Sequence, residues 1–205
     1  ERENAGLNNR VENRTHVIAK TFDKICNVLT ELGYMEGEKP LPQGKILAKI
    51  YAESDLLLTE IIRKGYLDEL STPDLISVVS SIIFQSRSSE EISPKIPNQN
   101  VADTLATIAK LWAQLSEIEE DHGVQTQKQP DYGFCYISHR WANGNSLQNV
   151  LKGSDMSVGD FVRSTKQLVD LLGQIAAASE NLRVKCQEGI KKLDRGVVSY
   201  LMGEL

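Results

Sequence analysis

The sequence predicts an all-α helical bundle, and three observations support this fold class. Most long segments place apolar residues every three or four positions, which is the spacing of a helix with one buried face. Serine or threonine precedes several of these segments and glycine follows them, as at helix starts and ends. No segment alternates apolar and polar residues as a half-buried strand would. We therefore expect helices packed around a common core.

The N-terminal part contains one predicted helix and a break. The helix ends at Gly33, and its apolar row consists of Ile18, Phe22, Ile25, Leu29 and Leu32. The polar residues 1–14 before it show no helix start of their own. The stretch 36–44 contains two prolines and is the best candidate for a domain boundary. We expect residues 1–40 to form a small separate unit and residues 41–205 to form the bundle.

Three segments follow before the first long loop. Apolar residues within 46–51 and 56–62 predict two short helices. Thr72 as N-cap, with Pro73 in the first turn, predicts the start of the third. Its apolar residues lie on nearly every side, so this helix should be central in the core. Residues 86–100, rich in serine, proline and asparagine, predict a loop.

A long amphipathic helix is predicted from Val101 to about Gly123. Its last turn, Glu-Glu-Asp-His at 119–122, is expected to be a solvated helix end and not an acidic site. A connector leads to a shorter helix over 134–141, and Ser146 caps a brief helix after it.

Two further helices complete the predicted bundle. Ser157 and Asp160 form an aspartate variant of the capping box at the start of a helix over 157–179. The last helix is predicted to be continuous, with its apolar residues at Cys186, Ile190, Leu193, Val197 and Leu201.

The helix over 157–179 carries a polar stripe, which consists of Arg163, Lys166, Gln167, Asp170 and Gln174. At about 100° per residue, three of these side chains fall within about 40° of Arg163, and Lys166 lies about 60° away. The apolar residues lie on the opposite half of the helix. The stripe is either a solvated surface or a surface held against a ligand, and helical spacing alone fits both readings.

The residues argue against several chemistries. Gly44-Lys45 is followed by Ile46, so the hydroxyl that a P-loop needs for magnesium is missing. Cys135 and His139 share a helix face, but no second pair of ligands lies at a spacing suited to zinc. We therefore do not expect this chain, by itself, to be an enzyme or to hold a metal or cofactor.

The net charge and the hydropathy of the sequence exclude further functional classes of protein. The net charge of -5 argues against a freestanding basic domain whose affinity comes from neutralising phosphates. The sequence contains no apolar run of about 18 residues, so it predicts no membrane-spanning helix. The three cysteines lie far apart, so we expect reduced thiols in a cytoplasmic protein.

Four stretches together resemble a known family, in the order in which that family carries them. They are GKILAKIYAESDLLLTEIIRKGYLDELSTPDLISVVSSIIFQSR, DYGFCYISHRWANGNSLQNVL, GDFVRSTKQLVDLLGQIA and LRVKCQEGIKKLDRGVVSYL. This set is similar to the C-terminal helical domain, called DSHCT, of DExH-box superfamily II RNA helicases, in the variant of the HelY-type helicases of actinobacteria. The resemblance covers roughly residues 41–205.

The resemblance implies a place in an ATP-driven motor. In such helicases two RecA-like lobes hydrolyse ATP with magnesium, while a winged-helix unit and this bundle close a channel around single-stranded RNA. One "ratchet" helix touches the bases, and residues 157–179 match it. The implied RNA contacts are Arg163, Gln167 and Asp170, with Lys166 and Gln174 beside them, and no residue is implied to be catalytic.

The resemblance also implies partners and a larger protein. Residues before 41 would be the tail of the winged-helix unit, and a chain that opens on Glu1 would be a C-terminal piece of the helicase. Its partners would be the RecA-like lobes and, in addition, an RNA-degrading protein. Two alternatives stay open, namely a helical scaffold for a protein partner and the equivalent domain of a DNA helicase.

Overall fold

The computed structural model describes residues 2–86 and 94–200, and the described part is all-α, which confirms the predicted class. Part of the predicted loop, residues 87–93, and Leu201 of the predicted last helix lie outside the described residues. The elements are α1 (Arg2–Glu31), β1 (Met35–Glu36), β2 (Lys39–Pro40), α2 (Pro42–Leu47), α3 (Asp55–Arg63), α4 (Thr72–Ile83), α5 (Gln99–Asp121), the 3₁₀ turn η1 (Tyr132–Phe134), α6 (Cys135–Ala142), α7 (Leu147–Leu151), α8 (Val158–Ala178), α9 (Glu180–Leu193) and α10 (Val197–Tyr200). The strands form one antiparallel hairpin.

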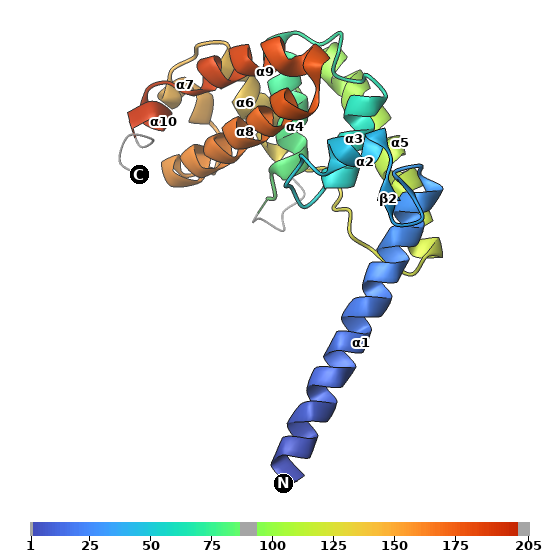
Figure 1. Cartoon of the computed structure of the whole chain (residues 1–205). Helices are drawn as coiled ribbons and strands as arrows, with labels where there is room; N and C mark the ends of the chain where they lie inside the picture. The colour runs from blue at the N-terminus through green and yellow to red at the C-terminus, as the bar shows by residue number, and fades with distance from the viewer. Residues whose placement is uncertain (1, 87–93, 201–205) are drawn as a thin grey trace.

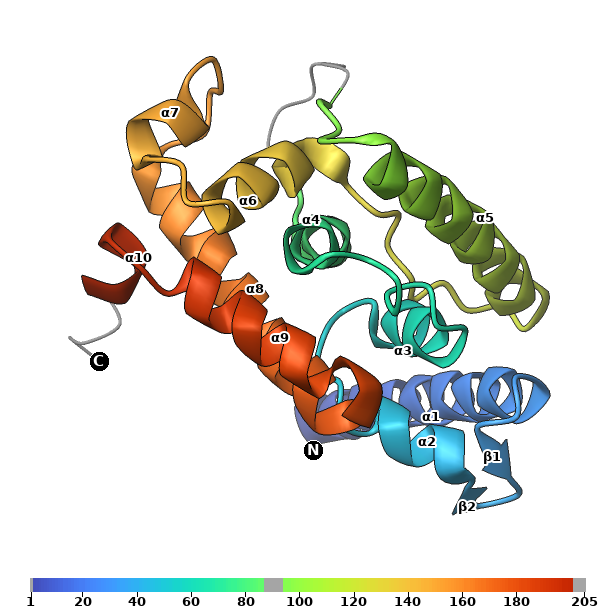
Figure 2. The ribbon, with the colours of Figure 1, turned by 90° about the horizontal axis from the view of Figure 1, so that it is seen from above.

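Helix α4 lies at the centre of the bundle, as its sequence predicts. Figure 2 shows it end-on, with α5, α6, α8 and α9 around it. Ten of its twelve residues are buried, including serines whose hydroxyls bond to carbonyls, such as Ser77 to Cys135 at 2.8 Å. The predicted N-cap is wrong by one residue. The Ser71 hydroxyl accepts the Asp74 N–H at 3.3 Å, while Thr72 is already helical and donates to the Glu188 carboxylate at 2.7 Å.

Helix α1 is longer than predicted and extends away from the bundle (Figure 1). It begins at Arg2, because a polar segment without proline can continue a helix that is anchored at its other end. Only part of the predicted apolar row is buried, since the side chains of Ile18 and Phe22 are 69% and 64% exposed. Near the end of the helix Val28 is buried in a small cluster with Tyr34 and Leu56.

Residues of α1 and of the turn after it contact residues on the other side of the predicted domain boundary at residue 40. The boundary itself stays a prediction. The Lys24 ammonium donates to the Gly123 carbonyl at 3.0 Å. The Tyr34 hydroxyl donates to the buried Glu60 carboxylate at 2.6 Å. Burial, and then this hydrogen bond, raise the pKa of Tyr34 well above its usual range. The phenol therefore stays neutral, so the donor is retained at any physiological pH.

The end of α5 differs from the predicted solvated helix end. Glu119 is 2% exposed, because the chain after Gly123 folds back over the helix. The Glu119 carboxylate accepts the backbone N–H groups of Thr126 and Gln127 at 2.8 and 3.1 Å. The Gln127 side chain in turn accepts the Leu57 N–H at 3.1 Å, so this carboxylate holds the connector against α3. The prediction failed because it treated the four polar residues as one group, whereas Glu119 is buried and His122 is half-buried.

The predicted last helix is interrupted between α9 and α10. Gly196 has a φ of +54°, a left-handed conformation that ends the regular helix and favours glycine. The Arg195 guanidinium lies 3.5 Å from the Trp141 ring centre and donates to the carbonyls of Trp141 and Asn145 at 2.6 and 2.8 Å. The Trp141 indole N–H donates to the Leu193 carbonyl at 2.9 Å. This turn therefore fixes Trp141 between helices, as its sequence context predicts.

Two of the three cysteines should be chemically inert in the folded chain. Burial raises the pKa of the Cys135 and Cys186 thiols to about 12, so at pH 8 about one in ten thousand is a thiolate. Cys26 on α1 is only half-buried. We expect iodoacetamide to modify Cys26 alone in the native chain, and all three cysteines after unfolding in guanidinium. Mass spectrometry of the adducts measures this, and rapid native labelling of Cys135 would contradict it.

Gly44 on α2 should tolerate no side chain. A Cβ at this position would lie 2.5 Å from the Tyr34 carbonyl oxygen, so the backbone of one element rests directly on another. We expect Gly44→Ala to lower the free energy of unfolding by about 1–3 kcal/mol through overpacking. The matched control is Gly173→Ala on α8, where no atom lies within 4 Å. That change should raise stability by about 0.5–1 kcal/mol through helix propensity, and urea titrations showing the same sign for both would contradict the prediction.

Candidate nucleic-acid interface

Helix α8 is fixed at its start and along its inner face. The Ser157 hydroxyl accepts the Asp160 N–H at 3.0 Å and donates to the Asp160 carboxylate at 2.8 Å, which confirms the predicted cap. The side chains that pack against the core are fully buried, namely Phe161, Leu168, Leu172 and Ile175. The rotation of α8 is therefore set by its core contacts, and the polar stripe must face outward.

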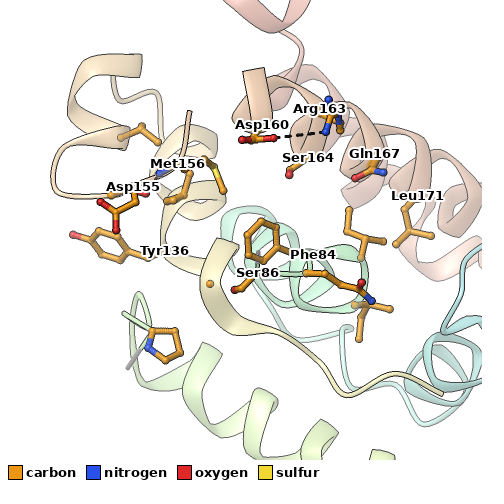
Figure 3. A pocket seen from close by; sticks show the side chains of 18 of the residues that line it. Phe84, Ser86, Tyr136, Asp155, Met156, Asp160, Arg163, Ser164, Gln167 and Leu171 are labelled. Carbon is orange, nitrogen blue, oxygen red and sulfur yellow. Dashed lines mark hydrogen bonds and ion pairs between the residues drawn. The ribbon is translucent and has the colours of Figure 1, made fainter. Parts of the chain in front are cut away.

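The polar stripe forms one wall of a groove of about 940 Å³ (Figure 3). Four of its five predicted residues line this groove, and Lys166, which is half-buried, does not. The other walls come from the α2–α3 connector, the end of α4, the start of α6 and the loop between α7 and α8. The structure therefore brings the predicted residues together and adds a facing surface. Added lining residues include Tyr51, Phe84, Tyr136, Met156, Asp160, Ser164 and Leu171.

Phe84 forms the floor of the groove, and its side chain points into the groove (Figure 3). Its ring stacks on that of Phe134 with centroids 5.4 Å apart. Gly133 leaves room for this ring, because a Cβ there would lie 2.8 Å from Phe84 Cε1. The Asp131 carboxylate accepts the N–H groups of Ser86 and Gly133 at 2.6 and 2.8 Å, which holds both segments in place.

The floor continues into the core as a series of aromatic contacts. Phe134 meets Phe161 of α8 edge-on at 6.2 Å, and Phe161 meets Trp141 edge-on at 5.1 Å. These are favourable geometries for aromatic pairs. The groove floor is thus packed, ring against ring, as far as the turn that contains Arg195.

The charges that line the groove nearly balance. Among the described residues that line the groove, three are basic, namely Lys95, Lys152 and Arg163, and four are acidic, namely Glu53, Asp155, Asp160 and Asp170. Arg163 is itself 3.6 Å from the Asp160 carboxylate. Such a surface does not concentrate phosphate groups, and it offers donors and acceptors side by side.

The stripe residues differ in how far they are already engaged. Asp170 accepts a hydrogen bond from the Gln174 amide at 2.8 Å. Gln174 also accepts the Tyr51 backbone N–H at 2.6 Å, so both groups serve a contact within the protein. No described residue hydrogen-bonds the Gln167 amide, which lies exposed in the groove wall. Gln167 therefore has a donor and an acceptor available to a ligand.

Cys135 and His139 do not form a reactive pair. Cys135 is fully buried with a raised pKa, and His139 instead meets the buried Asp74 carboxylate at 3.2 Å. Asn143 contacts the other ring nitrogen of His139 at 3.3 Å. Within residues 2–86 and 94–200, no three histidine, cysteine or acidic side chains cluster closely enough to hold a metal ion. In the same part of the chain, no helix has the length and apolar character needed to cross a membrane.

Comparison with known proteins identifies the family to which this architecture belongs. The model of the DSHCT (NUC185) domain matches residues 37–201. The chain is 34% identical to "Probable helicase HelY" of Mycobacterium leprae and 32% identical to that of Mycobacterium tuberculosis H37Rv, over 99% of this chain and 24% of each relative. It is 28% identical to the mouse "Exosome RNA helicase MTR4", over 83% of this chain and 17% of the relative.

The chain therefore spans about a quarter or less of the length of the curated relatives it matches. The relatives carry helicase names, and the matched family is the one that the sequence motifs predict. The family match covers most of the chain, from the hairpin through α2 to α10. This protein belongs to the DSHCT (NUC185) domain family of helicase-associated helical domains.

Proposed function

We propose that this chain is the non-catalytic helical domain of an ATP-dependent RNA helicase and that the groove along α8 receives single-stranded RNA. The observation that carries the proposal is the groove itself, which four of the five polar-stripe residues line opposite an aromatic floor. A solvated surface helix needs no such facing wall. The names of the relatives support the helicase assignment, and the name of the mouse relative includes RNA.

The groove suits contacts with bases better than contacts with phosphates. Gln167 can pair its amide with a base edge, and Arg163 can place its planar guanidinium on a base face or a phosphate. Asp170 and its neighbouring carboxylates repel phosphates and accept hydrogen bonds from exocyclic amines. A nearly neutral surface also releases a strand readily, and a translocating motor must release and rebind its strand at every step.

The remaining parts of the motor belong to the rest of the whole protein in this proposal. RecA-like lobes of the same chain would bind ATP and magnesium, and the protein would act in the cytoplasm. An exposed apolar row on α1, with Val17, Ile18 and Phe22 at least 61% exposed, favours a protein contact there. Such contacts, to the lobes or to an RNA-degrading partner, would use a different surface from the groove.

The first test changes the stripe in the full-length protein. Gln167→Ala and Asp170→Ala should each lower RNA-stimulated ATPase activity and unwinding by about two- to tenfold, the size of one or two net hydrogen bonds. Gln187→Ala is the matched control, because Gln187 is an exposed amide on α9 that does not line the groove.

Unchanged ATPase and unwinding in both stripe variants would contradict the proposal. Single-stranded DNA, used as activator in place of RNA, should stimulate the unmodified protein less. Equal stimulation by DNA would favour the alternative of a DNA helicase domain. Normal activity of the stripe variants together with loss of binding to a protein partner would favour a scaffold.

The second test is the salt dependence of RNA binding by this chain alone. Three cations of the described part of the chain line the groove, and each phosphate neutralised on a single strand contributes about 0.7 to the slope of log K against log salt. We expect weak binding at physiological salt and a slope no steeper than about 2, measured by fluorescence anisotropy. Lys191→Ala, a change of an exposed cation on α9, should leave the slope unchanged. A much steeper slope would show that phosphates dominate.

A further inference from the structure

Tyr51 is the most exposed large hydrophobic side chain among the described residues, at 81%. It lies in the connector between α2 and α3, at one end of the groove along α8. It also lines a second, shallower hollow of about 520 Å³ that continues along the C-terminal half of α8, past Gly173 and Ala177. A single exposed tyrosine needs no explanation by itself, but this one stands where two hollows on the same helix meet.

The backbone at Tyr51 is held firmly although its ring is not packed. The Tyr51 N–H donates to the Gln174 side-chain oxygen at 2.6 Å, and Gln174 donates to Asp170 at 2.8 Å. Two residues earlier in the connector, the Lys49 ammonium donates to the Ala177 carbonyl at 3.2 Å. Ile50 is buried, at 3% exposure. The connector is thus tied to α8 on both sides of a buried anchor, and the ring is held in solvent at the edge of the groove.

The charge balance of the groove requires another source of affinity for a strand. With three cations against four carboxylates among the described lining residues, neutralisation of phosphates supplies little. Aromatic stacking supplies affinity without net charge, and it accepts any base because every base has a π-face. A tyrosine held at the edge loses little conformational freedom when a base stacks on it, because its backbone is already fixed.

We infer that Tyr51 is a nucleic-acid-binding residue that stacks on a base of the single strand where the strand passes from the groove to the second hollow. This inference rests on the proposed function of the groove and adds a contact on an element outside α8. Gln174 and Asp170, two residues of the polar stripe, then also hold the backbone that presents this ring.

The test measures binding of a fluorescein-labelled ten-nucleotide oligouridine, and of a ten-unit strand of the same backbone without bases, to this chain. Tyr51→Ala should weaken binding of the oligouridine about tenfold, and Tyr51→Phe should bind within twofold of the unmodified chain because the ring is retained. The matched control is Phe22→Ala, which removes a 64% exposed ring from α1 and should have no effect. Since the Tyr51 ring is unpacked, none of these changes should alter the thermal unfolding midpoint.

A second readout follows the ring directly. Tyr51→Trp should place an indole in solvent, and titration with oligouridine to millimolar concentration should quench its fluorescence. The strand without bases should not quench it. The unmodified chain provides the background from Trp112 and Trp141.

The possible outcomes distinguish failure of this inference about Tyr51 from failure of the proposed function of the groove. Equal oligouridine affinity for Tyr51→Ala and the unmodified chain would overturn stacking by Tyr51 and leave the proposed function standing. An equal loss of affinity for both strands in Tyr51→Ala would also overturn stacking, because it would show a backbone contact. Absence of any oligouridine binding by the unmodified chain at millimolar concentration would overturn the proposed function together with the inference.

Discussion

The need to bury α4 on every side organises this domain. A helix that is apolar all round must be covered all round, and only a bundle of other helices can do this. Small serine side chains on α4 allow α6 to approach closely, and their hydroxyls donate to carbonyls of α4 and α6. Gly189 similarly brings α9 against Ile76 and Leu172. The surrounding helices are therefore positioned by α4, and their outer faces are left for other contacts.

The groove is a consequence of this arrangement. Helix α8 turns its apolar face to the core, so its polar stripe faces away from α4 and α9. The chain leaving α4 at Phe84 passes below that stripe, and the aspartate-held segment at Gly133 closes the same side. The groove thus arises where the central helix ends, from residues whose first role is to pack or to turn the chain.

Local sequence signals predicted the helices well, because caps and periodic apolar residues act within one turn of the chain. Ser157 with Asp160 and the glycines at 33, 123 and 153 mark ends that the structure contains. The predictions were wrong at two places. The inward turn of Glu119 depends on a connector that folds back, which is a tertiary contact that no local signal reports. The break before α10 lies at Gly196, and the predicted helix ran through this glycine because the apolar spacing continues on both sides of it. The polar stripe of α8 could be predicted from the sequence because all its residues lie on one helix. The facing wall could not be predicted, because Tyr51, Phe84 and Met156 lie in three separate segments and no sequence periodicity relates them.

The aromatic contacts between Phe84 and Trp141 have one further consequence. Rings packed against each other at interior density cannot shift independently, so the groove floor and the turn at Arg195 form one mechanical unit. The depth of the groove at this end is therefore set partly by residues around Arg195 that do not line it. A substitution at Gly196 or Arg195 would therefore change the shape of the groove through the packed rings, although neither residue lines it.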